Sequence, residues 1–386
     1  MVNRCYHRCR GRAGESMRVG VSKEIKSEEY RVGLVPSSVR ELVAAGHSVT
    51  VEHGAGAGIS ADDEDYQRAG ATIAASARDV FAEADMIVKV KEPQPGEWAQ
   101  LREGQILFTY LHLAPDPEQA RGLINSGATS IAYETVVDAS GGLPLLAPMS
   151  EVAGRLSIEA AGQSLRRHSG GRGLLLGGVP GVQPARVVVL GGGVVGTHAS
   201  RMAVGLGAEV TVIERSIPRL RQLDELFGGR VRTRLSTIEV VEQEIASADV
   251  VVGAVLVPGA SAPKLVTREM LSLMKRGVVI VDVAIDQGGC FQTSRPTTHA
   301  DPTFIVDDIV HYCVANMPGA VPLTSSYALN NATLPYVLEL ARDGLGAVTR
   351  SPGLRAGLNV HRGRVYNDAV AESLGLPFED VDALVA

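Results

Sequence analysis

The stretch Val187–Arg215, VVVLGGGVVGTHASRMAVGLGAEVTVIER, decides how this chain folds. It begins with a β-branched apolar run typical of a buried strand, and glycines follow at Gly191, Gly193 and Gly196, where a helix opens. The first glycine allows a tight turn, the second lets backbone approach a pyrophosphate, and the third permits close packing of helix on strand. The helix N-terminus offers N–H groups to phosphates. This strand–turn–helix context predicts a dinucleotide-binding domain.

The end of the next strand indicates which dinucleotide binds. AEVTVIER places Glu214 at its carboxyl end, where a carboxylate accepts hydrogen bonds from ribose hydroxyls and repels a 2′-phosphate. Arg215 and Arg219 follow closely, and arginine can hold a 2′-phosphate. We therefore expect NAD as the cofactor, and the two arginines are the residues that argue against strict selectivity.

The alternation of strands and helices continues on both sides of this stretch. Downstream, ADVVVGAVLVPG and GVVIVDVAID are further apolar strands; upstream, strands begin at Met17 and include SVTVEHGAG, ADMIVKVKEP, GQILFTYLHLAPDP and TSIAYETV. Strands separated by helical stretches predict parallel sheets with right-handed crossovers.

Two long helical patterns divide the chain. They cover PMSEVAGRLSIEAAGQSLRRHSGG and YALNNATLPYVLELARDG. We expect an α/β protein with two Rossmann-like, doubly wound parallel-sheet domains joined by long helices. Residues 145–321 form the nucleotide-binding domain and residues 17–144 form the other. The tail, residues 322–386, has too few elements for a third domain, so we expect it to pack on the first domain, which is then discontinuous.

Composition excludes several classes of protein. The chain has 386 residues with 45% hydrophobic and 21% charged, as in a globular protein. A net charge of −6 gives no basic field for nucleic acid, and no apolar run reaches the roughly 20 residues of a membrane span. Residues 1–16 are basic without an apolar core, so we expect a disordered extension rather than a signal peptide. Only Cys290 and Cys313 lie beyond them, which indicates a cytoplasmic protein.

Polar residues follow the strands of the first domain. Arg31 lies in the loop after the first strand, Lys89 and Lys91 lie two apart in VKVKEP, and His112 ends LFTYLH. A spacing of two puts both lysines on one face of a strand. Ligands of open parallel sheets bind at the carboxyl ends of the strands. We expect Arg31, Lys91 and His112 to converge there, the cations on a small carboxylate and the imidazole as general acid–base.

A further pair of carboxylates follows the strand in Gly277–Phe291, GVVIVDVAIDQGGCF. A buried carboxylate is costly unless it is paired or used, so Asp282 and Asp286 each need a partner or a role. For Asp282 we expect hydrogen bonds to a neighbouring loop.

Nearly all of the chain from Met17 resembles the alanine dehydrogenase family, which also includes the soluble nucleotide-binding part of proton-translocating transhydrogenase. The matching stretches are MRVGVSKEIK, KVKEP, GQILFTYLHLA, SIAYETV, LPLLAPMSEVAGR, GGRG, GGVPGV, GAVLVPGA, VDVAIDQGGCF, SRPTTH, YCVANMPGAVP and NATLPYVLELA.

The resemblance implies roles for matched positions. It implies His112 and Asp286 as catalytic residues, and Arg31 and Lys91 as substrate-binding residues. It implies a usually hexameric assembly and, in some members, magnesium near Glu339 and Asp343, although histidine is commoner at the second position. The residues expected to bind the cofactor, from the glycine motif and from the resemblance, are Ser150, Gly191, Gly193, Val194, Val195, Gly196, Glu214, Arg219, Ser236, Val255, Leu256, Val283, Ala284, Ile285, Arg295, Val314, Ala315, Asn316 and Met317.

The activity implied is reversible NAD-dependent oxidative deamination of L-alanine to pyruvate and ammonium. Two alternatives remain open at this point. One is a dehydrogenase of the same architecture that acts on another amino acid. The other is a nucleotide-binding regulatory protein, or a transhydrogenase component that works only with membrane partners. Arg31, Lys91 and His112 together argue against it, because a pure nucleotide module needs no such set.

Overall fold

The computed structural model describes residues 16–255 and 262–384 and divides the chain into two compact units. Unit 1 comprises the chain up to Pro148 together with Val321–Ala386, and unit 2 is Met149–Ala320. Residues 1–15, 256–261, 385 and 386 lie outside the description, so the extension expected at residues 1–16 is almost wholly beyond it. The chain crosses from unit 1 to unit 2 inside helix α6 (Ala147–Ser164) and returns just before helix α10 (Pro322–Asp343).

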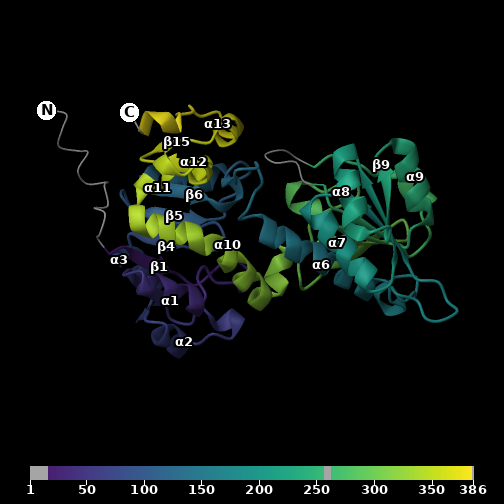
Figure 1. The fold of residues 1–386 in the computed structure, drawn as a ribbon, viewed down its shortest axis with the longest axis horizontal. Coiled ribbons are helices and arrows are strands. Elements are labelled where there is room, and N and C mark those ends of the chain that lie inside the picture. Colours follow the sequence, from purple (N-terminus) through teal and green to yellow (C-terminus); the bar gives the residue numbers. More distant parts are fainter. Residues whose placement is uncertain (1–15, 256–261, 385–386) are drawn as a thin grey trace. The chain divides into compact units, whose positions relative to one another are not determined.

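Unit 1 contains an eight-stranded sheet (Figure 1). Its six neighbouring parallel strands are followed, beyond β6, by two antiparallel strands from the C-terminal tail. In spatial order the strands are β3 (Thr72–Ala74), β2 (Ser48–Glu52), β1 (Arg18–Val21), β4 (Met86–Val88), β5 (Ile106–Thr109), β6 (Thr129–Ala132), β14 (Leu358–His361) and β15 (Arg364–Val365). The tail thus completes the sheet of unit 1.

Helices connect these strands, and several begin at residues that suit a helix start. Asp62, Ser76 and Asp116 cap α2, α3 and α5 by accepting backbone N–H groups, as short polar side chains do at this position. The helices of unit 1 are α1 (Pro36–Ala44), α2 (Asp63–Arg68), α3 (Ala77–Glu83), α4 (Pro95–Trp98), α5 (Pro117–Ser126), α10, α11 (Leu345–Arg350), α12 (Pro352–Gly357) and α13 (Asp368–Leu374), with 3₁₀ turns η1 (Ala57–Ile59), η2 (Tyr133–Thr135) and η7 (Val381–Leu384).

Buried polar side chains of α10 hold the loop that follows β1. The Ser326 hydroxyl accepts the N–H of Val32 at 3.2 Å, and the Asn330 side chain accepts the N–H of Val35 at 2.9 Å while donating to the Gly33 carbonyl at 3.1 Å. The side chains of Ser326 and Asn330 are both buried. Because a buried backbone group without a partner is costly, these bonds fix the path of the loop directly after Arg31.

Unit 2 contains a seven-stranded sheet. The order is β9 (Val231–Leu235), β8 (Glu209–Glu214), β7 (Arg186–Leu190), β10 (Val250–Gly253), β11 (Val279–Asp282), β13 (Ile309–Tyr312) and β12 (Thr303–Val306), and β12 is the antiparallel member. Both units share the same order for their parallel strands, with the first strand of each series between the second and the fourth. This is the doubly wound arrangement of dinucleotide-binding folds.

Successive residues of β7 enter two different cores. Val187 and Val189 pack with α6, α7 (Val194–Gly205) and α8 (Ile217–Phe227), whereas Val188 and Leu190 pack with α9 (Ile238–Ser247) and η4 (Glu269–Leu273). The remaining 3₁₀ turns are η3 (Arg167–Ser169), η5 (Val283–Gln287) and η6 (Met317–Ala320). Burial of both faces explains why the strands read as continuous apolar runs.

The expected α/β class with two sheets is confirmed, but the sheets are mixed rather than purely parallel. The antiparallel pairs β12–β13 and β14–β15 are each joined by a short turn, which needs no helical crossover, and β12 and β15 are edge strands. Among the residues that the structure describes, none of the helices combines the length and the apolar character that crossing a bilayer demands.

Candidate functional site

The residues expected to bind substrate follow neighbouring strands of unit 1. Arg31 comes after β1, Lys91 after β4 and His112 after β5, and these strands are adjacent in the sheet. Since parallel strands end at one edge, the structure brings the three residues to the same edge of the sheet. Their roles remain predictions, and the local surroundings of each residue decide what it can do.

Arg31 is buried and held by a carboxylate. It is 2% exposed, and its guanidinium donates from Nε to Glu29 Oε1 at 2.7 Å and from Nη2 to Glu29 Oε2 at 2.5 Å. Burial alone would lower the pKa of Arg31, but the hydrogen bonds and charge of Glu29 outweigh it, so the pKa is raised. The bidentate pair fixes the plane of a group that recognises carboxylates by geometry.

The expectation that the two lysines share one face of a strand is wrong, because both lie beyond the end of β4. β4 ends at Val88, and Lys89 is fully buried, with Nζ 2.7 Å from Glu97 Oε1 and 3.2 Å from Glu24 Oε2. Lys91 is half-buried. Burial opposes the charge of Lys89, but the two glutamates outweigh it and raise its pKa. Lys89 is therefore a structural cation, and Lys91 remains the candidate for substrate.

Glu24 links the buried lysine to the candidate one. Its Oε1 accepts the backbone N–H of Val90 at 2.7 Å and that of Lys91 at 3.4 Å, while its Oε2 pairs with Lys89. Sequence reasoning missed this residue, although a glutamate just after a buried strand, in RVGVSKE, was a usable signal. The carboxylate ties the start of the loop that carries Lys91 to the loop after β1.

His112 occupies an unusual backbone conformation. Its φ is +49°, in the left-handed region, where a residue other than glycine costs on the order of 1–2 kcal/mol. Its side chain is 44% exposed and lies parallel to the Tyr110 ring, with 5.9 Å between centroids. Burial raises the pKa of the Tyr110 phenol, which donates to the Leu145 carbonyl at 2.5 Å. Strained residues that persist in a fold concentrate at functional sites.

Glu134, in η2 directly after β6, was also missed by sequence reasoning. Its carboxylate accepts the backbone N–H of His112 at 2.6 Å and that of Leu111 at 3.1 Å. The signal was again a polar residue at a strand end, in SIAYETV, and β6 is the neighbour of β5 in the sheet. The edge therefore carries a glutamate beside each of its basic groups.

In unit 2, the glycine motif has the geometry that a pyrophosphate site requires. Gly191 has φ +101°, and a Cβ added at Gly196 would lie 1.9 Å from the Gly191 carbonyl oxygen, so neither position accepts a side chain. A Cβ at Gly193 would meet nothing within 4 Å, because this residue caps α7 and faces open space. The loop therefore presents bare backbone and a helix N-terminus, which fits a dinucleotide.

Glu214 and Arg219 both form hydrogen bonds with this loop. Glu214 accepts the N–H of Gly192 at 2.8 Å and that of Ser216 at 2.9 Å. Arg219 donates to the Gly192 carbonyl and to the Thr197 hydroxyl, each at 2.7 Å. The carboxylate is thus positioned where ribose hydroxyls bind in this fold, and the guanidinium reinforces the loop from α8.

Most other residues expected to bind cofactor follow carboxyl ends of strands in unit 2. Leu256 lies outside the described residues. Ile285, Val314 and Met317 have buried side chains, so only their backbone is available to a ligand. Arg295 stacks 4.2 Å from the Phe304 ring centroid, and Asn316 has φ +60°. The others are Ser150 on α6, Val194 and Val195 at the start of α7, Ser236 after β9, Val255 after β10, Val283 and Ala284 in η5, and Ala315 after β13.

The two aspartates after β11 differ in environment. Asp282 is fully buried and accepts the backbone N–H of Cys290 at 2.9 Å and the Ser294 hydroxyl at 2.6 Å. Burial raises its pKa, although these hydrogen bonds oppose the shift. Asp286 is exposed in η5. Asp282 therefore fastens the loop that carries Asp286, as expected, and only Asp286 is available for chemistry.

The magnesium site expected near Glu339 and Asp343 is not supported. Within residues 16–255 and 262–384, no group of three or more histidine, cysteine, aspartate or glutamate residues is placed to hold a metal ion. Asp343 pairs instead with Arg342 at 2.8 Å and Arg350 at 2.6 Å, and these bonds lower its pKa. A carboxylate neutralised by two guanidinium groups is a poor ligand for a hard cation.

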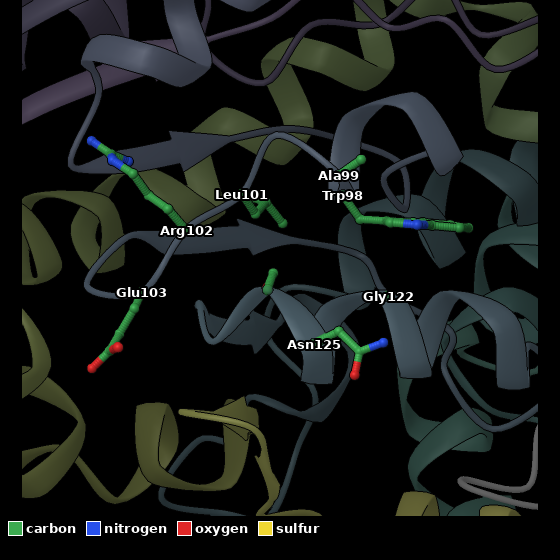
Figure 2. A pocket seen from close by; sticks show the side chains of 8 residues that line it. Trp98, Ala99, Leu101, Arg102, Glu103, Gly122 and Asn125 are labelled. Atoms are coloured by element: carbon green, nitrogen blue, oxygen red, sulfur yellow. The ribbon is translucent and has the colours of Figure 1, made fainter.

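A hollow of about 500 Å³ in unit 1 contains none of the predicted residues (Figure 2). Arg102 and Glu103 precede β5 and Ser126 precedes β6, so the hollow lies at the amino ends of strands, opposite the edge where ligands of parallel sheets bind. In Figure 2 the Arg102 and Glu103 side chains point away from Trp98. Its lining is Trp98, Ala99, Leu101, Arg102, Glu103, Gly122, Asn125 and Ser126.

Comparisons with known proteins agree with this geometry. Residues 20–153 match the model "Alanine dehydrogenase/PNT, N-terminal domain", and residues 157–368 match the corresponding C-terminal domain. A relative named alanine dehydrogenase from Halomonas elongata is 56% identical, covering 96% of this chain and 100% of its own. One of the same name from Mycolicibacterium smegmatis is 54% identical, covering 96% of this chain and 100% of its own.

Solved structures give the same result. A structure titled L-alanine dehydrogenase superimposes with a TM-score of 0.90 at 52% identity, covering 93% of this chain and 99% of that one. A transhydrogenase from Sinorhizobium meliloti superimposes with a TM-score of 0.79 at 27% identity, covering 91% of this chain and 99% of that one. With both of its units matched in this way, the chain belongs to the alanine dehydrogenase/PNT family.

Proposed function

We propose that this protein is an amino-acid dehydrogenase that catalyses the reversible NAD-dependent oxidative deamination of L-alanine to pyruvate and ammonium. The observation that carries the proposal is the set Arg31, Lys91 and His112 at one edge of unit 1, in a chain whose other unit has a dinucleotide loop. Relatives that are 51–56% identical over at least 94% of the chain bear the name alanine dehydrogenase. This favours alanine over another amino acid and over a transhydrogenase role.

Arg31 and Lys91 would bind the substrate at its charged end. Arg31 is held flat by Glu29, so its guanidinium is ready to meet a carboxylate without losing further side-chain freedom. Lys91 extends from a loop whose backbone is tied to Glu24. Two cations at fixed places orient a small amino acid, and such positioning can supply several kcal/mol of the barrier reduction.

His112 would move the protons. It would accept a proton from the water that attacks the imino carbon, and it would return a proton to the departing nitrogen as pyruvate and ammonium form. General acid–base help of this kind is typically worth about 10²–10⁴-fold. Asp286, exposed in η5, would orient or deprotonate groups on the reacting nitrogen or the water.

Residues of unit 2 would hold NAD, whose nicotinamide, when bound, accepts the hydride from the substrate α-carbon. Gly193 and the N-terminus of α7 would bind the pyrophosphate, and Glu214 would accept hydrogen bonds from the ribose. We also propose that unit 1 is the substrate domain, that unit 2 is the NAD domain, and that the protein acts as a cytoplasmic homohexamer.

The test is a direct assay. Purified protein is mixed with L-alanine and NAD⁺ at alkaline pH, and NADH is followed by absorbance, with NADP⁺ and other amino acids in parallel reactions. We expect NADH with L-alanine and NAD⁺ and much less in the other reactions. NADH binding is measured separately by fluorescence. If NADH binds and no amino acid is oxidised, the dehydrogenase proposal is wrong, and the transhydrogenase role is the one to test next.

A further inference from the structure

In the peptide group that joins Leu111 to His112, both the carbonyl and the N–H form hydrogen bonds with side chains. The Leu111 carbonyl accepts a hydrogen bond from the side chain of Gln119, a buried residue of α5, at 2.8 Å. The His112 N–H donates to Glu134 at 2.6 Å. This peptide leads directly into the left-handed turn at His112, where φ is +49°. A conformation that side chains rarely adopt is therefore kept by two side chains from different elements.

Glu134 forms more of the hydrogen bonds that fix this segment than Gln119 does. Its Oε1 accepts from both Leu111 and His112, and its Oε2 lies 3.2 Å from the Leu111 N–H. Hydrogen bonds to an ionised carboxylate are shorter and roughly twice as strong as neutral ones. The Glu134 side chain is 17% exposed, so water competes only partly for its oxygens.

The carboxylate acts on the backbone of His112 rather than on its ring. The ring Nδ1 lies 3.8 Å from Glu134 Oε1, which is longer than a hydrogen bond. The ring is oriented instead by the Tyr110 ring, which lies parallel to it, and Tyr110 packs edge-on against Tyr133 at 5.1 Å. Tyr133 directly precedes Glu134, so one short segment, η2, supports both the backbone and the ring of His112.

We propose that Glu134 is a positioning residue for His112 in the dehydrogenase reaction, an inference that rests on the function proposed above. The carboxylate fixes the turn at His112 and thereby aims the imidazole at the substrate edge of unit 1. In this role the carboxylate acts through His112 and needs no contact with substrate or cofactor. Because a misplacement of about 1 Å can cost about 10²-fold in rate, loss of this support slows turnover without removing the imidazole.

The first test compares Glu134→Ala, Glu134→Gln and Glu134→Asp by steady-state kinetics. We expect Glu134→Ala to lower kcat about 10²-fold, while KM for L-alanine and the Kd for NADH change by less than about 3-fold, since the binding groups remain. Glutamine keeps one acceptor oxygen and should fall between wild type and alanine. Aspartate keeps the charge and should recover part of the loss. Wild-type kcat in Glu134→Ala would overturn the proposal.

A double-variant cycle separates positioning from general structural damage. If Glu134 acts only through His112, then His112→Ala/Glu134→Ala is no slower than His112→Ala alone, because an absent imidazole cannot be misplaced. If the two losses multiply, Glu134 acts independently of His112 and the proposal is wrong. Asp62→Ala is the matched control, because Asp62 also accepts a backbone N–H, at the start of α2. This control should leave kcat unchanged.

Amide hydrogen exchange gives a readout that does not depend on activity. Exchange measured by mass spectrometry over Leu111 and His112 should accelerate in Glu134→Ala and remain slow in Asp62→Ala, since only the first change removes the acceptor of these N–H groups. If wild type oxidises no amino acid while this exchange difference is present, the proposed function fails and the structural role of Glu134 stands. Unchanged exchange means that Glu134 does not accept hydrogen bonds from these N–H groups in solution.

Discussion

The carboxyl edges of the two sheets are built by different means. In unit 1, glutamates hold the basic residues that follow the strands: Glu24 pairs with Lys89 and accepts the backbone N–H of Lys91, Glu29 pairs with Arg31, and Glu134 accepts the backbone N–H of His112. In unit 2, the corresponding edge is formed by the glycine loop, where bare backbone and the start of α7 face open space. One edge is organised mainly by paired charges and the other mainly by the absence of side chains.

The difference follows from what each edge is proposed to bind. A small amino acid offers few contacts, so the groups that meet it must be fixed individually, and a carboxylate partner does this for each one. A dinucleotide is long and carries its own charges, so close approach of backbone is sufficient at its pyrophosphate. The two edges should therefore fail in different ways when they are mutated.

The largest effect is expected at His112. Replacing it by alanine removes the proposed proton-transfer group from the charge-built edge, and turnover should fall about 10²–10⁴-fold. NADH affinity should stay within about 2-fold, because the glycine loop is untouched, as fluorescence titration can check. Near-wild-type turnover in this variant would show that His112 is not the proton-transfer group of this edge.

A substitution at Lys89 tests whether the buried glutamates of unit 1 need their cation for stability. Lys89→Met leaves Glu24 and Glu97 buried without a cation, and breaking a buried pair in this way destabilises a fold by about 3–5 kcal/mol. Thermal unfolding measures the loss. The control is Lys26→Met, because Lys26 pairs with Glu92 at a partly exposed position, and such pairs contribute about 0–1 kcal/mol. Equal losses in the two variants would contradict this assignment.

Two glycines test the backbone-built edge. Gly196→Ala places a Cβ 1.9 Å from a carbonyl oxygen, and overpacking of this kind costs about 1–3 kcal/mol. Gly193→Ala meets no atom within 4 Å, so its unfolding temperature should be unchanged while its NADH affinity falls, because the new methyl group obstructs the pyrophosphate. Loss of stability in both variants, or in neither, would mean that the loop is not built as described.

The smallest effect is expected at Glu214, the charged residue within the backbone-built edge. Glu214→Ser should lower the ratio of kcat/KM for NAD⁺ to that for NADP⁺ about tenfold, about 1.4 kcal/mol, because the repulsion of a 2′-phosphate is removed and Arg219 remains nearby. Glu214→Gln is the control for loss of charge with retained shape. An unchanged ratio in both variants would show that another residue selects the cofactor.

The glycine loop could be predicted from sequence because its requirements are local. A tight turn, a close approach and a helix start lie within Gly191–Gly196, so contiguous residues reveal them. The edge of unit 1 could be predicted only in part. Arg31, Lys91 and His112 were recognisable as residue types at strand ends, but Glu134 meets His112 across 22 residues and Glu24 meets Val90 across 66. No local pattern reports such pairs.

The error at Lys89 has a specific physical origin. Alternation of faces holds only while a strand continues, and β4 ends at Val88. The chain then turns so that Lys89 points into the interior toward Glu97 on α4. The antiparallel strands of the tail were unexpected for a similar reason, since β6, the strand on which β14 pairs, is more than 200 residues away along the chain.

The bonds between α10 and the loop after β1 have a consequence for synthesis. The Val35 N–H is 295 residues from its acceptor on Asn330, so the proposed substrate-binding loop is not secured until nearly the whole chain has left the ribosome. At about 5–20 residues per second, that interval is on the order of 15–60 s. The proposed nucleotide-binding unit ends at Ala320, ten residues before Asn330, so the loop can be secured about 0.5–2 s after that unit is complete. Chains that stop between these two residues are therefore expected to bind a dinucleotide without turning over an amino acid.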